Sequence, residues 1–272
     1  MEREIKKDLN HLPIIKRKVL RVDLREDHIK SIMDEIVVED EIDVYINGEH
    51  YAAFTVLPSE VKELIIGHLL SEGIISRIEM VNDIRISRNK VDVQIDNIKI
   101  SALKKPQIIL AECGGSWRVP AWLWMGTKGS RNSSGMKVSS ETIMKTSQTL
   151  NLMAKVYRRT GGTHSSALFD EDGKLLALSE DVSRHNAVDK VVGKAALNNV
   201  DFGRAILAST GRLSSEVVIK AANVHVPIII SISAPTDKGI KIAEATGLTL
   251  IGFARGKRFN IYANPHRIRE LG

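Results

Sequence analysis

The sequence predicts a mixed α/β protein, and three stretches of the chain carry this prediction. Residues 206–254 alternate as strand, helix, strand, helix and strand, which is the pattern of parallel βαβ units. Two short apolar runs, 165–169 and 175–179, flank a turn rich in Asp and Gly and predict a hairpin. Two further predicted strands flank Asn47-Gly48, a typical hairpin turn, so an α+β region is expected to precede the α/β region.

The composition is that of a globular protein with a mild positive charge. The chain has 272 residues, 43% of them hydrophobic, and a formal net charge of +6. This length suits one large domain or two smaller ones. The charge permits an anionic ligand or partner. We expect no nucleic-acid binding, because aromatic residues make up only 4% of the chain and are not interleaved with the basic residues.

The single cysteine, Cys113, cannot form an internal disulfide, so a reducing cytoplasm is the expected location. The first eight residues are mostly charged and lack the apolar core of a signal peptide. The longest apolar run, near residues 226–232, is too short to span a bilayer. We therefore expect no membrane association.

We divide the chain into an α+β scaffold domain (1–105), a flexible loop that carries Cys113 (106–137) and a second domain (138–272). The first 20 residues are expected to be a loosely held, charged lead-in with a strand at its end. Strands are then expected over 35–38, 42–46 and 51–56, followed by a small meander over 84–87, 91–95 and 98–100. Nothing in the scaffold domain suggests catalysis.

One helix is expected in the scaffold domain, opened by Pro58 and stopped by Gly73. His68 lies on the apolar stripe of this helix, so we interpret it as a packed residue rather than a ligand. In the second domain, helices are expected from Ser139 to about Arg159 with a stop at Gly161, from an N-cap at Asn186, after Ser214, and after Pro235 with an end at Gly247.

The loop around Cys113 is rich in Gly and Ser and has no helical or strand periodicity, which is typical of a functional segment. All three tryptophans of the chain lie close to Cys113 and either cover an apolar surface or form a landing patch for a partner. A thiolate can attack a persulfide sulfur and carry it. The alternative is a buried structural cysteine, which the glycine-rich surroundings disfavour.

A crowded polar junction follows the predicted hairpin at Glu180–Asn186. Such strand-to-helix junctions offer free N–H groups and a positive dipole end, so they suit anions. His164 stands at the other end of the hairpin, which could bring it to the same edge as His185. The alternative is a set of caps and a packed turn. A metal site made of His164, Glu180 and His185 is a less favoured possibility.

A basic segment, Phe253–Arg258, follows a strand that is expected to be buried. Ligands of open α/β sheets gather at the carboxyl ends of strands, and three cations there could clamp phosphates. A plain basic hairpin turn is the alternative interpretation. Asn260 lies just beyond and could assist.

Several of these stretches together resemble the FdhD family of formate dehydrogenase accessory sulfurtransferases. The resemblance covers nearly the whole chain from about residue 20. The residues that carry it are Thr160–His164, Glu180–Lys190, Ser209–Ser214, Ser233–Thr236, Gly252–Tyr262, Ile46–Gly48 and Leu70–Ile75.

The resemblance implies that the second domain has the layered α/β sheet of the cytidine deaminase fold. It also implies that Cys113 carries a persulfide and that the chain binds the bis-molybdopterin guanine dinucleotide form of the molybdenum cofactor. The implied cofactor-binding residues are Phe253, Ala254, Arg255, Gly256, Lys257, Arg258, Asn260, His164, Arg184, His185 and Asn186. In the family a Cys-x-x-Cys begins at the place of Cys113, but Ser116 stands here at the second position.

The favoured function is therefore sulfur transfer from a cysteine desulfurase, through a Cys113 persulfide, to the cofactor destined for formate dehydrogenase. The alternative is a non-catalytic chaperone that binds and delivers the same cofactor. No zinc is expected, because deaminase-type sites need two cysteines besides a His or Cys ligand, and this chain has one cysteine. A homodimer is possible, and the sequence leaves the oligomeric state open.

Overall fold

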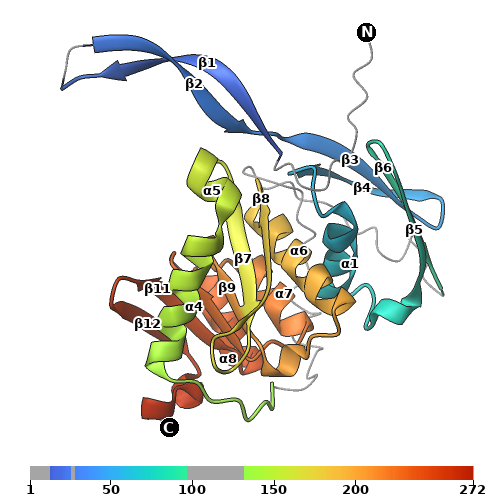
Figure 1. Cartoon of the computed structure of the whole chain (residues 1–272). Coiled ribbons are helices and arrows are strands. Elements are labelled where there is room, and N and C mark those ends of the chain that lie inside the picture. Colours follow the sequence, from blue (N-terminus) through green and yellow to red (C-terminus); the bar gives the residue numbers. More distant parts are fainter. Residues whose placement is uncertain (1–12, 26–27, 97–131, 272) are drawn as a thin grey trace.

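The computed structural model describes residues 13–25, 28–96 and 132–271, which form three sheets and the helices packed on them (Figure 1). Cys113, its neighbouring tryptophans and the predicted strand 98–100 lie outside the described residues. The α/β fold class is confirmed, with an α+β arrangement in the N-terminal part. In the described part, no helix is both long enough and apolar enough to cross a bilayer.

The N-terminal part contains a two-stranded ribbon and a four-stranded sheet. The ribbon pairs β1 (Ile14–Asp23) with β2 (His28–Val37). The sheet has the order β4-β3-β6-β5, with bounds β3 Asp40–Ile46, β4 Glu49–Val56, β5 Val81–Ser87 and β6 Lys90–Ile95. The hairpin turn at Asn47-Gly48 is confirmed, since both residues adopt the positive φ that this turn requires.

Two details of the N-terminal prediction are corrected. The strand expected over 35–38 belongs to the much longer β2, because its alternating residues continue pairing with β1 along its whole length. The helix expected after Pro58, α1 (Val61–Ser71), begins only at Val61, because Glu60 is left-handed with φ 53° and does not belong to the helix. A short 3₁₀ turn at Ile78–Met80 then leads into β5.

The C-terminal part is built on a six-stranded sheet with the order β12-β11-β10-β9-β7-β8. Its strands are β7 His164–Phe169, β8 Leu175–Asp181, β9 Ile206–Ser209, β10 Ile228–Ser231, β11 Thr249–Arg255 and β12 Arg258–Ala263. The central strands β9, β10 and β11 are parallel, as predicted from the alternation of strands and helices. The predicted hairpin is β7–β8, which pairs antiparallel around the Asp170–Gly173 turn.

Helices cover both faces of this sheet (Figure 1). On one face lies α4 (Ser140–Met153), whose Ile143 and Leu150 pack with Ile206, Ile228 and Ile230 of the sheet. The other face is covered by α6 (Arg184–Leu197), α7 (Ser215–Asn223) and α8 (Asp237–Thr246). Side chains of successive residues along a strand point into the hydrophobic cores on opposite faces of the sheet, as the pleat of a strand requires. A layered sheet with packed helices is thus confirmed.

The single helix predicted from Ser139 to about Arg159 is wrong, because the chain breaks at Ala154 into α4 and α5 (Lys155–Thr160). The buried carboxylate of Glu180 accepts hydrogen bonds from the backbone N–H groups of Val156 and Tyr157, both at 2.8 Å. These bonds satisfy the first N–H groups of a new helix, so the interruption costs little. The predicted stop at Gly161 is confirmed by its left-handed φ of 67°.

The two parts of the chain share one core, in which α1 crosses α6 with backbones almost touching. A Cβ atom on Gly67 would lie 1.7 Å from the carbonyl oxygen of Asp189, and one on Gly193 would lie 1.9 Å from that of Glu63. Only glycine allows this approach. The apolar residues of the four-stranded sheet, α1, α6 and α7 therefore form one continuous cluster. The domain boundaries proposed from the sequence stay a prediction.

Candidate anion-binding site

The carboxyl ends of the parallel strands form an edge that hydrogen bonds hold in place. The Ser231 hydroxyl, at the end of β10, donates to the carbonyl of Gly211 at 2.6 Å and accepts from the N–H of Ser233 at 2.9 Å. The N–H of Phe253 in β11 donates to the Ser233 carbonyl at 3.0 Å. The segments after β9 and β10 are thus tied to β11, at the edge where open α/β sheets bind ligands.

Four side chains that are cations or can become cations gather at this edge: His164, Arg184, His185 and Arg212. Burial lowers the pKa of His164, and the nearby charges of Arg184, His185 and Arg212 lower it further. The Nδ1 atom of His164 lies 3.3 Å from Thr210 Oγ1. The prediction that His164 and His185 share an edge is confirmed, and Arg212 is a member that the sequence analysis did not select.

Gly211 allows this gathering to be compact. A Cβ atom on Gly211 would lie 2.8 Å from Cβ and 3.0 Å from Cδ of Arg184, so the arginine stem lies directly over the glycine. The two neighbouring loops are brought within van der Waals contact in this way. Because guanidinium groups bind phosphate and carboxylate groups well, this cluster is a candidate site for an anionic ligand.

The acidic members of the predicted junction point into the protein instead. Glu180 accepts the α5 N–H groups and lies 3.2 Å from the Ser165 hydroxyl. Asp181 accepts from the N–H of Leu57 at 3.1 Å and pairs with the fully buried ammonium of Lys190 at 2.7 Å. Their oxygens are occupied by partners from the protein. Within the junction, Arg184 and His185 are therefore the side chains that take part in the cationic cluster.

The prediction that Asn186 caps α6 is wrong. The N-cap is Ser183, and Asn186 lies inside the first turn of the helix. The Asn186 amide donates to the carbonyl of Thr55 at 2.8 Å and to Asp181 at 3.0 Å. The Asn186 amide thus binds a distant strand and a neighbouring carboxylate from inside the helix. Ser183, which precedes Arg184, occupies the N-cap position instead.

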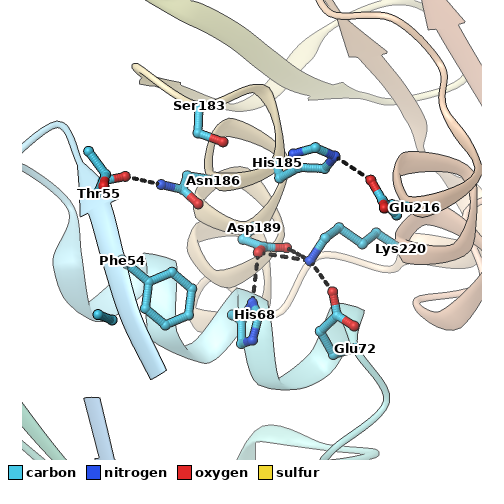
Figure 2. Close-up of a pocket in the computed structure, with 11 residues that line it drawn as sticks. Phe54, Thr55, His68, Glu72, Ser183, His185, Asn186, Asp189, Glu216 and Lys220 are labelled. Carbon is cyan, nitrogen blue, oxygen red and sulfur yellow. Dashed lines mark hydrogen bonds and ion pairs between the residues drawn. The ribbon is translucent and has the colours of Figure 1, made fainter. Parts of the chain in front are cut away.

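A small polar cavity of about 40 Å³ lies beside His185, between β4, α1, α6 and α7 (Figure 2). His185 lines it, and its Nε2 lies 3.1 Å from Glu216 of α7. The cavity is large enough for a few water molecules. The remaining lining residues are Ala53, Phe54, Thr55, His68, Glu72, Ser183, Asn186, Asp189 and Lys220.

The floor of the cavity is a buried ion pair. Asp189 lies 2.9 Å from the Lys220 ammonium, which also contacts Glu72 at 2.6 Å (Figure 2). Burial alone would raise the pKa of Asp189, but Lys220 and the hydrogen bond from His68 outweigh it and hold the pKa at about 2. Burial would lower the pKa of Lys220, and the two carboxylates raise it instead. Both groups are therefore charged at neutral pH.

The N-terminal part contributes residues to this cavity, which local sequence patterns do not predict. His68 is packed, as predicted, with Nδ1 3.0 Å from Asp189 and Nε2 2.9 Å from the Tyr51 hydroxyl. Glu72 lies one helical turn later. Glu72 is the C-cap residue of α1, and its spacing of four residues from His68 is the available signal, since it places the two polar side chains on one side of the helix end.

The basic segment Phe253–Arg258 forms the β11–β12 hairpin turn. Arg255, Lys257 and Arg258 are exposed, and the Arg255 guanidinium lies 5.6 Å from the centre of the Phe253 ring. The Ala254 side chain is buried in the core, and its carbonyl accepts a hydrogen bond from Ser147. The groups of this turn that could contact a ligand are therefore its exposed cations and one aromatic ring. Asn260 is also exposed, and its amide donates to the Tyr262 hydroxyl at 3.2 Å.

The hairpin turn and the cationic cluster lie at the same edge of the sheet but are not in contact. Strands β10 and β9 separate β11 from β7, which corresponds to about 14 Å at the usual strand spacing. The two groups therefore suit an elongated ligand with more than one anionic group. A single small anion would contact only one of them.

Within residues 13–25, 28–96 and 132–271, no three His, Cys, Asp or Glu side chains are placed to hold a metal ion. The less favoured metal site made of His164, Glu180 and His185 is not formed, because Glu180 is occupied by N–H groups and His185 faces Glu216. The expectation that the protein holds no zinc stays a prediction, as does the role of Cys113, which lies outside the described residues.

Fold and site together define an α/β protein with a basic edge at the carboxyl ends of its parallel strands. Residues 37–269 match the FdhD/NarQ family. The chain belongs to this family, as the resemblance predicted.

Individual relatives cover nearly the whole chain. It is 35% identical over 243 residues to the sulfur carrier protein FdhD of Methanothermobacter thermautotrophicus, which covers 89% of this chain and 95% of that protein. The protein of the same name from Saccharolobus solfataricus is 38% identical over 240 residues, covering 86% and 91%. That from Bacillus subtilis is 33% identical over 246 residues, covering 89% and 93%.

A solved structure shares the fold. The crystal structure of a formate dehydrogenase accessory protein from Desulfotalea psychrophila superposes with a TM-score of 0.75. The match covers 95% of this chain and 100% of that one at 23% sequence identity.

Proposed function

We propose that this protein is a sulfur carrier that modifies the molybdenum cofactor on its way to formate dehydrogenase. Family membership over residues 37–269, with relatives that are named sulfur carrier proteins, is the observation that supports it most. The sulfur donor is a cysteine desulfurase, and the carrier atom is the Cys113 sulfur. The reactions take place in the cytoplasm.

The chemistry consists of two exchanges at Cys113. In loading, the Cys113 thiolate attacks the outer sulfur of the donor persulfide, and the donor cysteine leaves as a thiolate. In unloading, an electron pair of the acceptor forms a bond to the outer sulfur while the S–S bond breaks. Cys113 then recovers its thiolate. Neither exchange needs a second cysteine, which agrees with Cys113 being the single cysteine of the chain.

The substrate proposed for unloading is bis-molybdopterin guanine dinucleotide, whose phosphates make it a long polyanion. The cationic cluster at His164, Arg184, His185 and Arg212 supports this choice, because it lies at the ligand-binding edge of the sheet. The exposed cations of the Phe253–Arg258 turn support a second contact. Arginine binds phosphate with paired donors, so it suits this task.

Mass spectrometry tests the carrier mechanism. The purified protein is incubated with a cysteine desulfurase and free cysteine, and Cys113 should gain the mass of one or more sulfur atoms. Cys113→Ser should gain none. If the wild-type protein binds the cofactor but never gains sulfur, the chain is a non-catalytic chaperone that only delivers the cofactor.

Binding of GDP, as a probe for the nucleotide end of the cofactor, tests the site. Replacing Arg255 and Arg258 by Ala should weaken binding by about 1.5–3 kcal/mol for each arginine that binds a phosphate. Lys241→Ala on α8 is a matched control, because this exposed cation pairs only with Asp237 among the described residues. An unchanged affinity in the double variant would place the nucleotide elsewhere.

A further inference from the structure

The β1–β2 ribbon leaves the body of the protein as an arm (Figure 1). Besides Leu24 in the turn, four large apolar side chains of the two strands are strongly exposed: Leu20 at 73%, Val22 at 58%, Ile29 at 64% and Met33 at 61%. The register places Val22 opposite Ile29, Leu20 opposite Ser31 and Met33 opposite Lys18, so all four lie on one face. An isolated two-stranded ribbon is marginal in water, and an exposed apolar patch marks an interaction site.

The charges of the arm indicate the chemistry of its partner. Arg21 and Lys30 lie directly opposite each other, an arrangement that is destabilising without a nearby anion. Lys18 lies on the apolar face itself. None of these three cations forms an ion pair with any residue that the structure describes. The two strands together carry five Lys or Arg residues against three acidic residues, Asp23, Asp34 and Glu35. A second copy would therefore add net positive charge, whereas a partner with acidic groups around an apolar centre would neutralise it.

The root of the arm lies next to the candidate site. Glu35 of β2 forms two hydrogen bonds with Arg159 of α5, at 2.8 and 2.6 Å. A Cβ atom on Gly162 would lie 2.6 Å from Val37 Cγ1, so the chain leading into His164 passes against the arm. Glu35 and Val37 share the face of the four apolar residues. At the root of the arm, the face that carries the four apolar residues therefore lies against the chain leading into the site.

We propose that the arm docks the protein that receives the finished cofactor, the formate dehydrogenase apoprotein, through an apolar groove edged with acidic residues. This proposal rests on the proposed function. Its physical basis is position: a partner held on the arm lies beside the edge from which the anionic cofactor must leave. A short transfer distance keeps a reactive ligand away from water, which favours the receiving protein over other partners at this surface.

Binding of purified formate dehydrogenase apoprotein from the same organism tests the proposal. Leu20→Asp combined with Met33→Asp places charge on the apolar face, and Arg21→Glu combined with Lys30→Glu reverses the charge of the other face. Each pair should weaken apoprotein binding about tenfold or more, and the charge reversal should also flatten its salt dependence. Ile86→Asp combined with Leu271→Asp is the matched control, because these exposed apolar residues lie away from the arm and should change nothing.

Two further measurements separate the possible results. GDP binding and sulfur loading of Cys113 should be unchanged in both arm variants, which shows that they are folded and that the proposed function stands independently. The docking proposal is overturned if the wild-type protein does not bind the apoprotein, or if the arm variants bind it with unchanged affinity. It is also overturned if the arm variants convert a dimer to a monomer in gel filtration while apoprotein affinity is retained, since the occupant would then be a second copy.

Discussion

The buried Asp189–Lys220 pair should make the stability of this protein depend on pH in a predictable window. Asp189→Asn keeps the size of the side chain but removes the charge that Lys220 faces at 2.9 Å. Breaking a fully buried pair in this way costs about 3–5 kcal/mol at neutral pH, because the remaining ammonium loses its main partner. Glu72 at 2.6 Å still contacts Lys220 and moves the expected cost to the lower end of that range.

The sign of the pH dependence follows from the pKa of Asp189, which is about 2 in the folded protein against an ordinary value of 3.8. A carboxyl group whose pKa is lower in the folded protein than in the unfolded chain stabilises the fold at pH values above its unfolded pKa. This contribution is lost as the pH falls through its folded pKa. The wild-type protein should therefore lose about 2 kcal/mol from this group between pH 5 and pH 2. The amide that Asp189→Asn introduces cannot titrate, so the difference in stability between the two proteins should shrink by that amount.

Urea unfolding of both proteins at several pH values between about 7 and 2.5 measures this difference directly. Asp237→Asn is the control, because Asp237 and Lys241 form an exposed pair 3.5 Å apart that should contribute less than about 1 kcal/mol. A gap between wild type and Asp189→Asn that is under about 1 kcal/mol at pH 7, or that stays constant down to about pH 2.5, would refute the reasoning.

Three other predictions concern the site and the core. Arg184→Ala combined with Arg212→Ala should weaken binding of the full dinucleotide cofactor by at least about tenfold while thermal stability stays nearly constant; titration calorimetry measures this, and unchanged affinity would show that no phosphate of the cofactor lies at the cluster. Cys113→Ser should abolish formate dehydrogenase activity in cells lacking the native protein, whereas Ser116→Ala should keep it; full activity of the serine variant would contradict the carrier mechanism. Gly67→Ala should destabilise the fold by several kcal/mol in chemical unfolding, because the new methyl group would meet the Asp189 carbonyl at 1.7 Å, and a neutral effect would show that α1 and α6 can separate.

The elements that local chemistry determines were predictable from the sequence. Gly161 and Gly247 end their helices in the left-handed conformation that glycine adopts without strain. The β7–β8 hairpin follows from its turn residues, and the parallel strands follow from short apolar runs separated by helices. In each of these cases the residues that decide the structure lie within a few positions of one another.

The misplaced features depend on residues far apart in the chain. The break at Ala154 is explained by Glu180, which lies 24 residues beyond Val156, whose N–H group donates to it. Asn186 leaves the capping position because its amide donates to Thr55, 131 residues away. The polar cavity was not foreseen because His68 and Asp189 are separated by 121 residues. No local pattern records such a pairing.

Arg212 illustrates the same limit for the site. His164, Arg184 and His185 lie at the two ends of the β7–β8 hairpin and could be selected from the sequence, but Arg212 belongs to the next strand–helix unit. It joins them because β9 pairs with β7, which brings the segment after Ser209 alongside His164. Strand order was not derivable from the sequence, so neither was this neighbour.

The crossing of α1 and α6 also affects how the protein is made. Asp189 and Lys220 supply the charges that face His68 and Glu72, and Gly193 supplies the surface against which Gly67 packs. On a ribosome, α1 emerges about a hundred residues or more before these partners. Domains that fold as units during synthesis begin with their N-terminal parts, but here the first sheet and α1 must wait with their apolar faces uncovered. Chaperone occupancy of nascent chains should therefore persist until Lys220 has left the exit tunnel.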